Sequence, residues 1–123
     1  MHRGFTHLNH IEELEQLLSE STTRPLLLFK HSYSCGISAE ALDELVDHLN
    51  HPPLDVRYAM VTVQTHRDVS NAVTATLGVR HETPQVLLVH EGRVVWSASH
   101  FRVTADAVHA AITAAGARAP VGR

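Results

Sequence analysis

Hydrophobic residues follow two spacings along this chain, and segments of the two kinds alternate. Apolar residues that recur every three or four positions predict amphipathic helices, whereas short continuous or alternating apolar runs predict strands. The helical spacing covers residues 10–20, 37–49, 69–77 and 105–112, and the strand-like runs cover residues 26–29, 56–61, 85–89 and 94–96. The continuous run at 26–29 is typical of a strand that is buried on both faces.

The ends of these segments contain residues that favour a helix start or a helix end. Asn9, Thr104 and either Asp68 or Ser70 are the expected N-caps, because their side-chain oxygens can accept hydrogen bonds from the free N–H groups of a first turn. Gly78 is expected to end the third helix as a C-terminal cap.

The order of the elements predicts the fold class. Pro52-Pro53 ends the second helix, and Glu91-Gly92 between two strand-like runs predicts a β-hairpin. The first strand–helix–strand unit should be a right-handed parallel crossover. We therefore expect an α/β domain with a central mixed sheet of about four strands and helices on both faces, which is the thioredoxin-like arrangement. Residues 1–115 would form this single domain, and residues 116–123 a loose C-terminal tail.

Composition narrows the possible functions. The chain has 123 residues, of which 44% are hydrophobic, and its formal net charge of −3 argues against a broad basic face for nucleic acid. No run approaches the roughly 18 apolar residues of a membrane-spanning helix, and the first residues lack the apolar region of a signal peptide. We expect a cytoplasmic protein with no membrane partner. The 11 histidines show no metal-binding spacing, so no metal site is expected.

The single cysteine, Cys35, lies where the first buried strand meets the second helix. Free backbone N–H groups and the positive end of the helix dipole favour the thiolate, which is the reactive form of cysteine. Without a second cysteine, this thiol would form and break mixed disulfides with an external partner. The alternative is an inert, buried cysteine that acts as a small hydrophobic residue. The polar, turn-like neighbours Ser32 and Ser34 favour the reactive interpretation.

Five neighbours are candidates for supporting the thiolate. Ser34 belongs to the polar turn, and Gly36 leaves room for a second sulfur to approach. Ser38 occupies the position of the second cysteine in a C-x-x-C motif, where its hydroxyl can donate a hydrogen bond to sulfur but cannot form a disulfide. Lys30 would stabilise the thiolate or hold an anionic thiol ligand; the alternative is a lysine that reaches solvent. His31 would add charge, or be structural or solvated.

Thr83-Pro84, directly before the run at 85–89, is the second candidate site. Proline is tolerated at the start of a strand because it lacks the N–H group. In a thioredoxin-like fold this loop lies beside the cysteine, where the backbone of Thr83 can pair with an extended substrate. The alternative is an ordinary trans proline that opens the strand.

Four segments of the chain resemble the YtxJ-like monothiol bacilliredoxin family, over about residues 10–112. They are FKHSYSCGIS (29–38), RDVSNA (67–72), VRHETPQVLL (79–88) and VWSASHF (95–101). The family often has proline at the position of Gly36 and serine at that of Thr83. The resemblance implies a thioredoxin-like fold, with Cys35 as the nucleophile and Thr83-Pro84 as a cis-proline loop. Ser99-His100 would brace the last strand or lie near a low-molecular-weight thiol.

The resemblance also implies a function. Such proteins are thought to remove the low-molecular-weight thiol bacillithiol from mixed disulfides on client proteins, with bacillithiol as co-substrate and without a metal or organic cofactor. Two alternatives remain open. Cys-Gly-Ile-Ser also resembles the Cys-Gly-Phe-Ser of monothiol glutaredoxins, which hold a [2Fe–2S] cluster between two subunits. The chain would otherwise be a non-catalytic thioredoxin-like interaction module with an inert cysteine.

Overall fold

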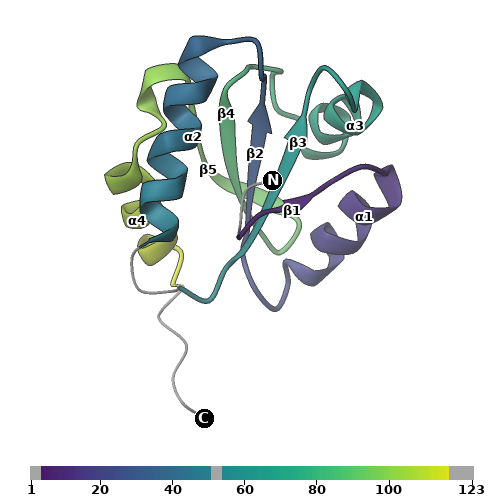
Figure 1. The fold of residues 1–123 in the computed structure, drawn as a ribbon. Coiled ribbons are helices and arrows are strands. Elements are labelled where there is room, and N and C mark those ends of the chain that lie inside the picture. Colours follow the sequence, from purple (N-terminus) through teal and green to yellow (C-terminus); the bar gives the residue numbers. More distant parts are fainter. Residues whose placement is uncertain (1–3, 51–53, 117–123) are drawn as a thin grey trace.

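The computed structural model describes residues 4–50 and 54–116 as one α/β domain. Its elements are β1 (Thr6–His7), α1 (Ile11–Glu20), β2 (Leu26–His31), α2 (Gly36–Leu49), β3 (Arg57–Thr62), α3 (Arg67–Leu77), β4 (Gln85–His90), β5 (Arg93–Ser99), the 3-10 turn η1 (His100–Arg102) and α4 (Ala105–Ala114). Figure 1 shows the sheet in the middle, with α2 and α4 on one face and α1 and α3 on the other. The predicted fold class is therefore confirmed.

The sheet has five strands in the order β1-β3-β2-β4-β5. β2 pairs with β3 in parallel and with β4 in antiparallel fashion, so the sheet is mixed as expected. Its additional strand, β1, contains only two residues, which is too short to show a strand pattern in the sequence. It extends the sheet by pairing Thr6 with Ala59 in parallel, and the N–H of Leu8 donates to the carbonyl of Met60 at 2.8 Å.

β2 supplies residues to two hydrophobic cores, because successive side chains of a strand point to opposite faces. All six of its residues are buried. Leu27 and Phe29 belong to the core that includes residues of α2 and α4, whereas Leu26 and Leu28 belong to the core that includes residues of α1 and α3. The same alternation sends the last two side chains, Lys30 and His31, to opposite sides of the sheet.

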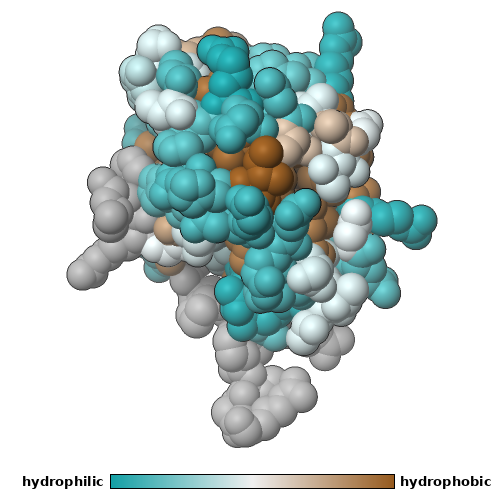
Figure 2. All heavy atoms as spheres, turned by 90° about the vertical axis from the view of Figure 1, so that its right-hand side faces the viewer, coloured by the Kyte–Doolittle hydropathy of each residue, from teal (hydrophilic) through white to brown (hydrophobic). Residues whose placement is uncertain are grey.

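The two helical layers cover these cores with their apolar faces. Leu45 of α2 and Ile112 of α4 are fully buried on one side, and Leu14 of α1 and Val73 of α3 are equally buried on the other. Burying a side chain of this size contributes about 1.5–3 kcal/mol relative to leaving it in water. The side of the molecule that carries α1 and α3 presents an apolar patch surrounded by hydrophilic residues (Figure 2).

Two predicted N-caps are wrong, by one residue in α1 and by two or four residues in α3. The N-cap of α1 is His10 instead of Asn9, because the carboxylate of Glu13 accepts hydrogen bonds from both backbone N–H groups, at 2.8 Å and 2.9 Å. α3 begins after His66, so Asp68 lies inside the first turn and Ser70 is buried within the helix. An acidic residue in the first turn also favours a helix start electrostatically, and this resembles an N-cap signal in the sequence.

The predicted caps at Gly78 and Thr104 and the predicted hairpin are confirmed. Gly78 ends α3 with a left-handed backbone, φ 67°. Thr104 caps α4 by accepting the N–H of Ala107 at 3.1 Å. Glu91 and Gly92 join β4 to β5 with φ values of 54° and 76°, and two positive φ angles are typical of a tight hairpin. Pro52-Pro53 and most of the predicted tail lie outside the described residues.

No helix within residues 4–50 and 54–116 is long and apolar enough to cross a membrane.

We expect Thr104→Ala to lower the free energy of unfolding by about 1 kcal/mol, because α4 loses the hydrogen bond that the Thr104 hydroxyl accepts from the N–H of Ala107. Urea denaturation followed by circular dichroism measures this change. Thr113→Ala, at an exposed position within the same helix, is the matched control and should shift stability by less than about 0.5 kcal/mol. Equal effects of the two substitutions would contradict the capping role.

Candidate active site

Cys35 is the N-cap of α2, with an extended backbone of φ −115° and ψ 122°. Its carbonyl accepts the N–H of Ala39 at 3.1 Å, and its side chain makes no capping hydrogen bond. The thiol is half-buried at the end of the sheet where β2 passes into α2. The first-turn N–H groups of a helix lack intrahelical acceptors, so this position presents free donors and the positive end of the helix dipole to the sulfur.

The Thr83-Pro84 loop lies at the same end of the sheet as the turn that leads to Cys35. Lys30 of β2 pairs with Gln85 of β4, so the residues after β2 and the residues before β4 leave the sheet at one edge. Pro84 is buried, Thr83 is half-buried, and the peptide bond between them is cis. The structure therefore brings together the two candidate sites that are almost fifty residues apart in the chain.

Gln64 contacts each of the three residues in the turn before Cys35, and no motif or spacing in the sequence indicated this contact. Its carboxamide nitrogen lies 2.5 Å from the hydroxyl of Ser32 and 2.9 Å from that of Ser34. Its carboxamide oxygen accepts the N–H of Tyr33 at 3.4 Å. The parallel pairing of β2 and β3 could have indicated this contact, because parallel strands end at the same edge and Gln64 follows β3 by two residues.

Ser38 and His31 form a buried pair under the same turn. The hydroxyl of Ser38 accepts the N–H of Ser32 at 3.0 Å and lies 2.8 Å from Nδ1 of His31. Ser38 donates to His31 if Nδ1 carries no hydrogen; if Nδ1 is protonated, the Ser38 hydrogen is released for another acceptor. A solvated His31 is therefore the wrong alternative, because its ring is buried and packs 5.4 Å from that of Phe29.

Lys30 is fully buried on the opposite face, so the alternative of a solvent-reaching lysine is wrong. Its ammonium group donates to the hydroxyl of Thr74 at 2.9 Å and contacts Nδ1 of His81 at 3.1 Å. These contacts hold its charge toward α3 and the loop before Pro84. Burial lowers the pKa of Lys30 to about 8. Burial and then the charge of Lys30 lower the pKa of His81, which favours a neutral ring that accepts the lysine N–H.

Ser99-His100 is attached to the proline loop through two contacts. The N–H of His100 donates to the carbonyl of Pro84 at 3.0 Å, and the hydroxyl of Ser99 donates a short hydrogen bond to Glu82. The Ser99 bond lowers the pKa of the Glu82 carboxyl group, and the nearby charge of His100 acts in the same direction. These contacts are those of a segment that braces the loop carrying Thr83.

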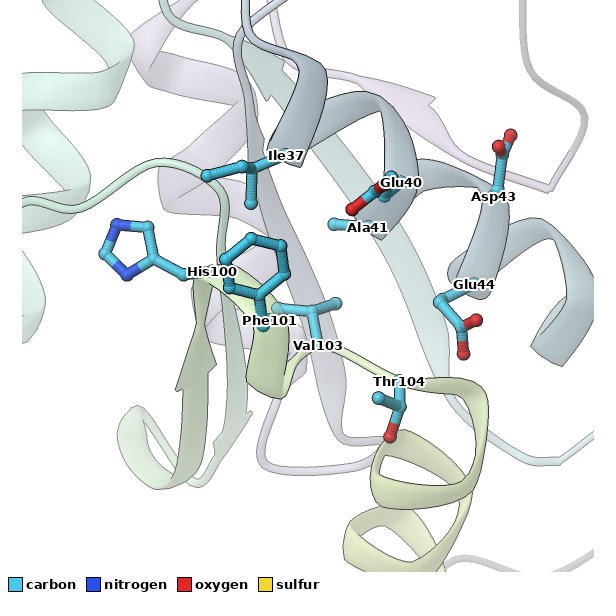
Figure 3. Close-up of a pocket in the computed structure, with 9 residues that line it drawn as sticks. All are labelled: Ile37, Glu40, Ala41, Asp43, Glu44, His100, Phe101, Val103 and Thr104. Atoms are coloured by element: carbon cyan, nitrogen blue, oxygen red, sulfur yellow. The ribbon is translucent and has the colours of Figure 1, made fainter.

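A pocket of about 350 Å³ lies between the start of α2 and the segment after β5. Ile37 and Ala41 line it from α2, and His100 and Phe101 line it from η1 (Figure 3). Phe101 is 71% exposed, and Tyr33 in the turn before Cys35 is 66% exposed. The surroundings of the thiol thus offer two exposed aromatic side chains to a binding partner.

Gly36 occupies the first position of α2 in open surroundings. A Cβ atom built on Gly36 would meet no atom within 4 Å. The structure therefore imposes no steric requirement for glycine here, and the position remains open to a sulfur that approaches Cys35. Residues 4–50 and 54–116 contain no group of three or more His, Cys, Asp or Glu side chains arranged to hold a metal ion.

A mixed sheet between two helical layers, with a lone thiol at the N-cap of the helix that follows the central strand, defines a thioredoxin-fold protein with thiol redox function. The sequence profile of the family described as "Monothiol bacilliredoxin BrxC" matches residues 6–108. The chain therefore belongs to the monothiol bacilliredoxin family, whose name and fold are those of thiol oxidoreductases.

Solved structures agree with the fold. A protein with a thioredoxin fold is 29% identical, with 88% of this chain and 93% of that chain covered and a TM-score of 0.78. Mitochondrial thioredoxin 3 from Saccharomyces cerevisiae is 18% identical, with coverages of 89% and 94% and a TM-score of 0.69. Thioredoxin from Trypanosoma brucei brucei is 10% identical, with coverages of 94% and 93% and a TM-score of 0.74. The two thioredoxins are similar in fold alone.

We expect the free energy of unfolding to rise more between about pH 8 and pH 10 in the wild type than in Lys30→Met. The pKa of Lys30 is about 8 when folded, against an ordinary value of 10.5, so the unfolded chain binds more protons in this range. The full effect is at most about 3 kcal/mol, at about 1.4 kcal/mol for each pH unit. Urea denaturation across this range measures it.

The comparison stops near pH 10 because burial raises the pKa of Tyr58 to about 12, which makes stability fall with pH above that point. Thr74→Val, which removes one acceptor but keeps the lysine charge, is the control and should retain the rise. Parallel stability curves for the wild type and Lys30→Met would contradict the buried charge.

We expect Gly36→Pro to raise the free energy of unfolding by about 0.5–1 kcal/mol, because proline restricts the unfolded chain. The N–H of a first helical residue has no intrahelical acceptor, and the extended Cys35 is compatible with a following proline. Urea denaturation measures the change. Gly78→Ala, at a left-handed backbone position, should instead lower stability by about 1 kcal/mol. A Gly36→Pro variant that is less stable than the wild type would contradict the placement of residue 36 as the first residue of α2.

Proposed function

We propose that this protein removes bacillithiol from mixed disulfides on client proteins, with Cys35 as the nucleophile. The observation that carries the proposal is a lone, half-buried thiol at the N-cap of α2, beside the proline loop, in a chain with no second cysteine. A single thiol can exchange with an external disulfide but cannot complete the reaction through an intramolecular disulfide. Family membership supports the choice of bacillithiol as the thiol that is exchanged.

The reaction would proceed in two exchange steps. The Cys35 thiolate attacks the bacillithiol sulfur of the mixed disulfide, a new Cys35–bacillithiol disulfide forms, and the client leaves as a thiolate that takes up a proton. A second bacillithiol thiolate then attacks the bacillithiol sulfur bound to Cys35. Oxidised bacillithiol leaves, and the Cys35 thiolate is restored. Free N–H groups at the start of α2 would stabilise negative charge on Cys35 sulfur in both steps.

The edge around Cys35 offers complementary contacts for a client. The Thr83 backbone, two residues before the start of β4, would pair with an extended client segment by strand addition. The exposed rings of Tyr33 and Phe101 would contact apolar side chains of that client. Bacillithiolated proteins and bacillithiol itself are thus the proposed partners, and the reaction would take place in the cytoplasm without a metal or organic cofactor.

We expect the reduced protein to form an adduct with one bacillithiol after exposure to oxidised bacillithiol, and to lose it when fresh reduced bacillithiol is added. Intact-protein mass spectrometry follows both steps. Cys35→Ser should form no adduct, because the only thiol of the chain has been replaced.

A peptide that carries a bacillithiol mixed disulfide tests the complete reaction. The wild type should release the peptide thiol, and Cys35→Ser should leave it bound to bacillithiol. A wild-type protein that forms no adduct and releases no peptide would contradict the proposed function.

A further inference from the structure

Gln64 lies beside the turn of Cys35 because β2 and β3 end together. The last residues of the two strands, His31 and Thr62, are paired in the parallel register. Val63, the first residue after β3, still donates its N–H to the carbonyl of His31 at 2.9 Å. Gln64 therefore leaves the sheet next to the three residues that connect β2 to Cys35.

The contacts of Gln64 determine the orientation of its carboxamide. The N–H of Tyr33 can only donate, so the atom that faces it at 3.4 Å must be the oxygen. The carboxamide nitrogen then faces the hydroxyls of Ser32 and Ser34, at 2.5 Å and 2.9 Å, and donates one hydrogen to each. One side chain thus binds three consecutive residues of the turn.

The orientation of the Gln64 carboxamide leaves the hydrogens of the two serine hydroxyls unused in these bonds. Each hydroxyl oxygen accepts a hydrogen from Gln64, so each serine keeps its own hydrogen for another acceptor. The two hydroxyl oxygens lie 3.5 Å apart, and only one of the two hydrogens can be used between them. At least one of the two serine O–H groups can therefore donate to an acceptor outside the pair. These serines lie within three residues of Cys35.

We propose that Gln64 is the positioning residue of the Cys35 thiolate. It holds the turn Ser32–Ser34 in place, and it leaves a serine hydroxyl hydrogen available to negative charge on the residue that follows the turn, Cys35. This role rests on the proposed function only in that Cys35 is the reacting thiol. Gln64 itself does not touch the substrate.

The test compares the alkylation rate of Cys35 by iodoacetamide, as a function of pH, in the full chain and three variants. Gln64→Leu removes all three bonds. Gln64→Glu keeps an acceptor for the N–H of Tyr33, but its carboxylate accepts the serine hydrogens and adds negative charge. Gln16→Leu is the matched control, because Gln16 bonds Glu20 on the exposed surface of α1.

We expect the rate near neutral pH to fall about fivefold in Gln64→Leu, which is the factor that one ordinary hydrogen bond contributes, because the turn that leads to Cys35 is no longer held in place. The pH of half-maximal rate should move upward in Gln64→Leu and further upward in Gln64→Glu, because like charge disfavours the thiolate. Gln16→Leu should match the wild type. Urea denaturation midpoints that stay close to that of the wild type would show that the variants fold.

Identical pH profiles for the wild type, Gln64→Leu and Gln64→Glu would overturn the proposal. A rate that falls in Gln64→Leu and is fully restored in Gln64→Glu would also overturn the donor role, because the glutamate cannot donate to the hydroxyls. Iodoacetamide reports the thiol without bacillithiol, so failure of the proposed function, seen as a missing bacillithiol adduct, is distinguishable from failure of this inference.

Discussion

Burial of β2 on both faces is the constraint on which the rest of this structure depends. The strand lies between β3 and β4, and its six residues are buried while their side chains alternate between two cores. A central strand that is held by two neighbours and two helical layers has a fixed register. Its last residue therefore leaves the sheet at a defined point, and the turn that carries Cys35 starts from there.

The two polar residues at the end of β2 extend this constraint to the active-site edge. Lys30 reaches Thr74 and His81 on one side, and His31 reaches Ser38 on the other. The contacts of Lys30 connect β2 to α3 and to the loop before Pro84, and the contact of His31 connects it to the first turn of α2. Contacts with both helical layers thus fix the end of β2, from which the turn to Cys35 starts. Cys35 itself stays partly accessible.

Polar side chains hold the loops in place at this edge of the sheet, whereas apolar packing holds the rest of the domain together. The carboxamide of Gln64 holds the turn from the end of β3, and the hydrogen bond between Ser99 and Glu82 holds the proline loop from the end of β5. Hydrogen bonds are directional, so they position groups more narrowly than apolar contacts do. A site that must remain open to a second sulfur cannot be filled with apolar side chains, and this explains why its supports are polar.

The sequence alone determined the α/β class, the mixed sheet, the hairpin at Glu91-Gly92 and the position of Cys35 before α2, because these follow from local spacing and turn residues. It did not show β1, whose two residues carry no period, or the shift of two helix starts to His10 and His66. The partners of Lys30 and Ser38 and the role of Gln64 were decided only by the tertiary structure. They depend on which strand ends meet at one edge and on which face each side chain lies, and residues far apart in the chain meet there only after the sheet has formed.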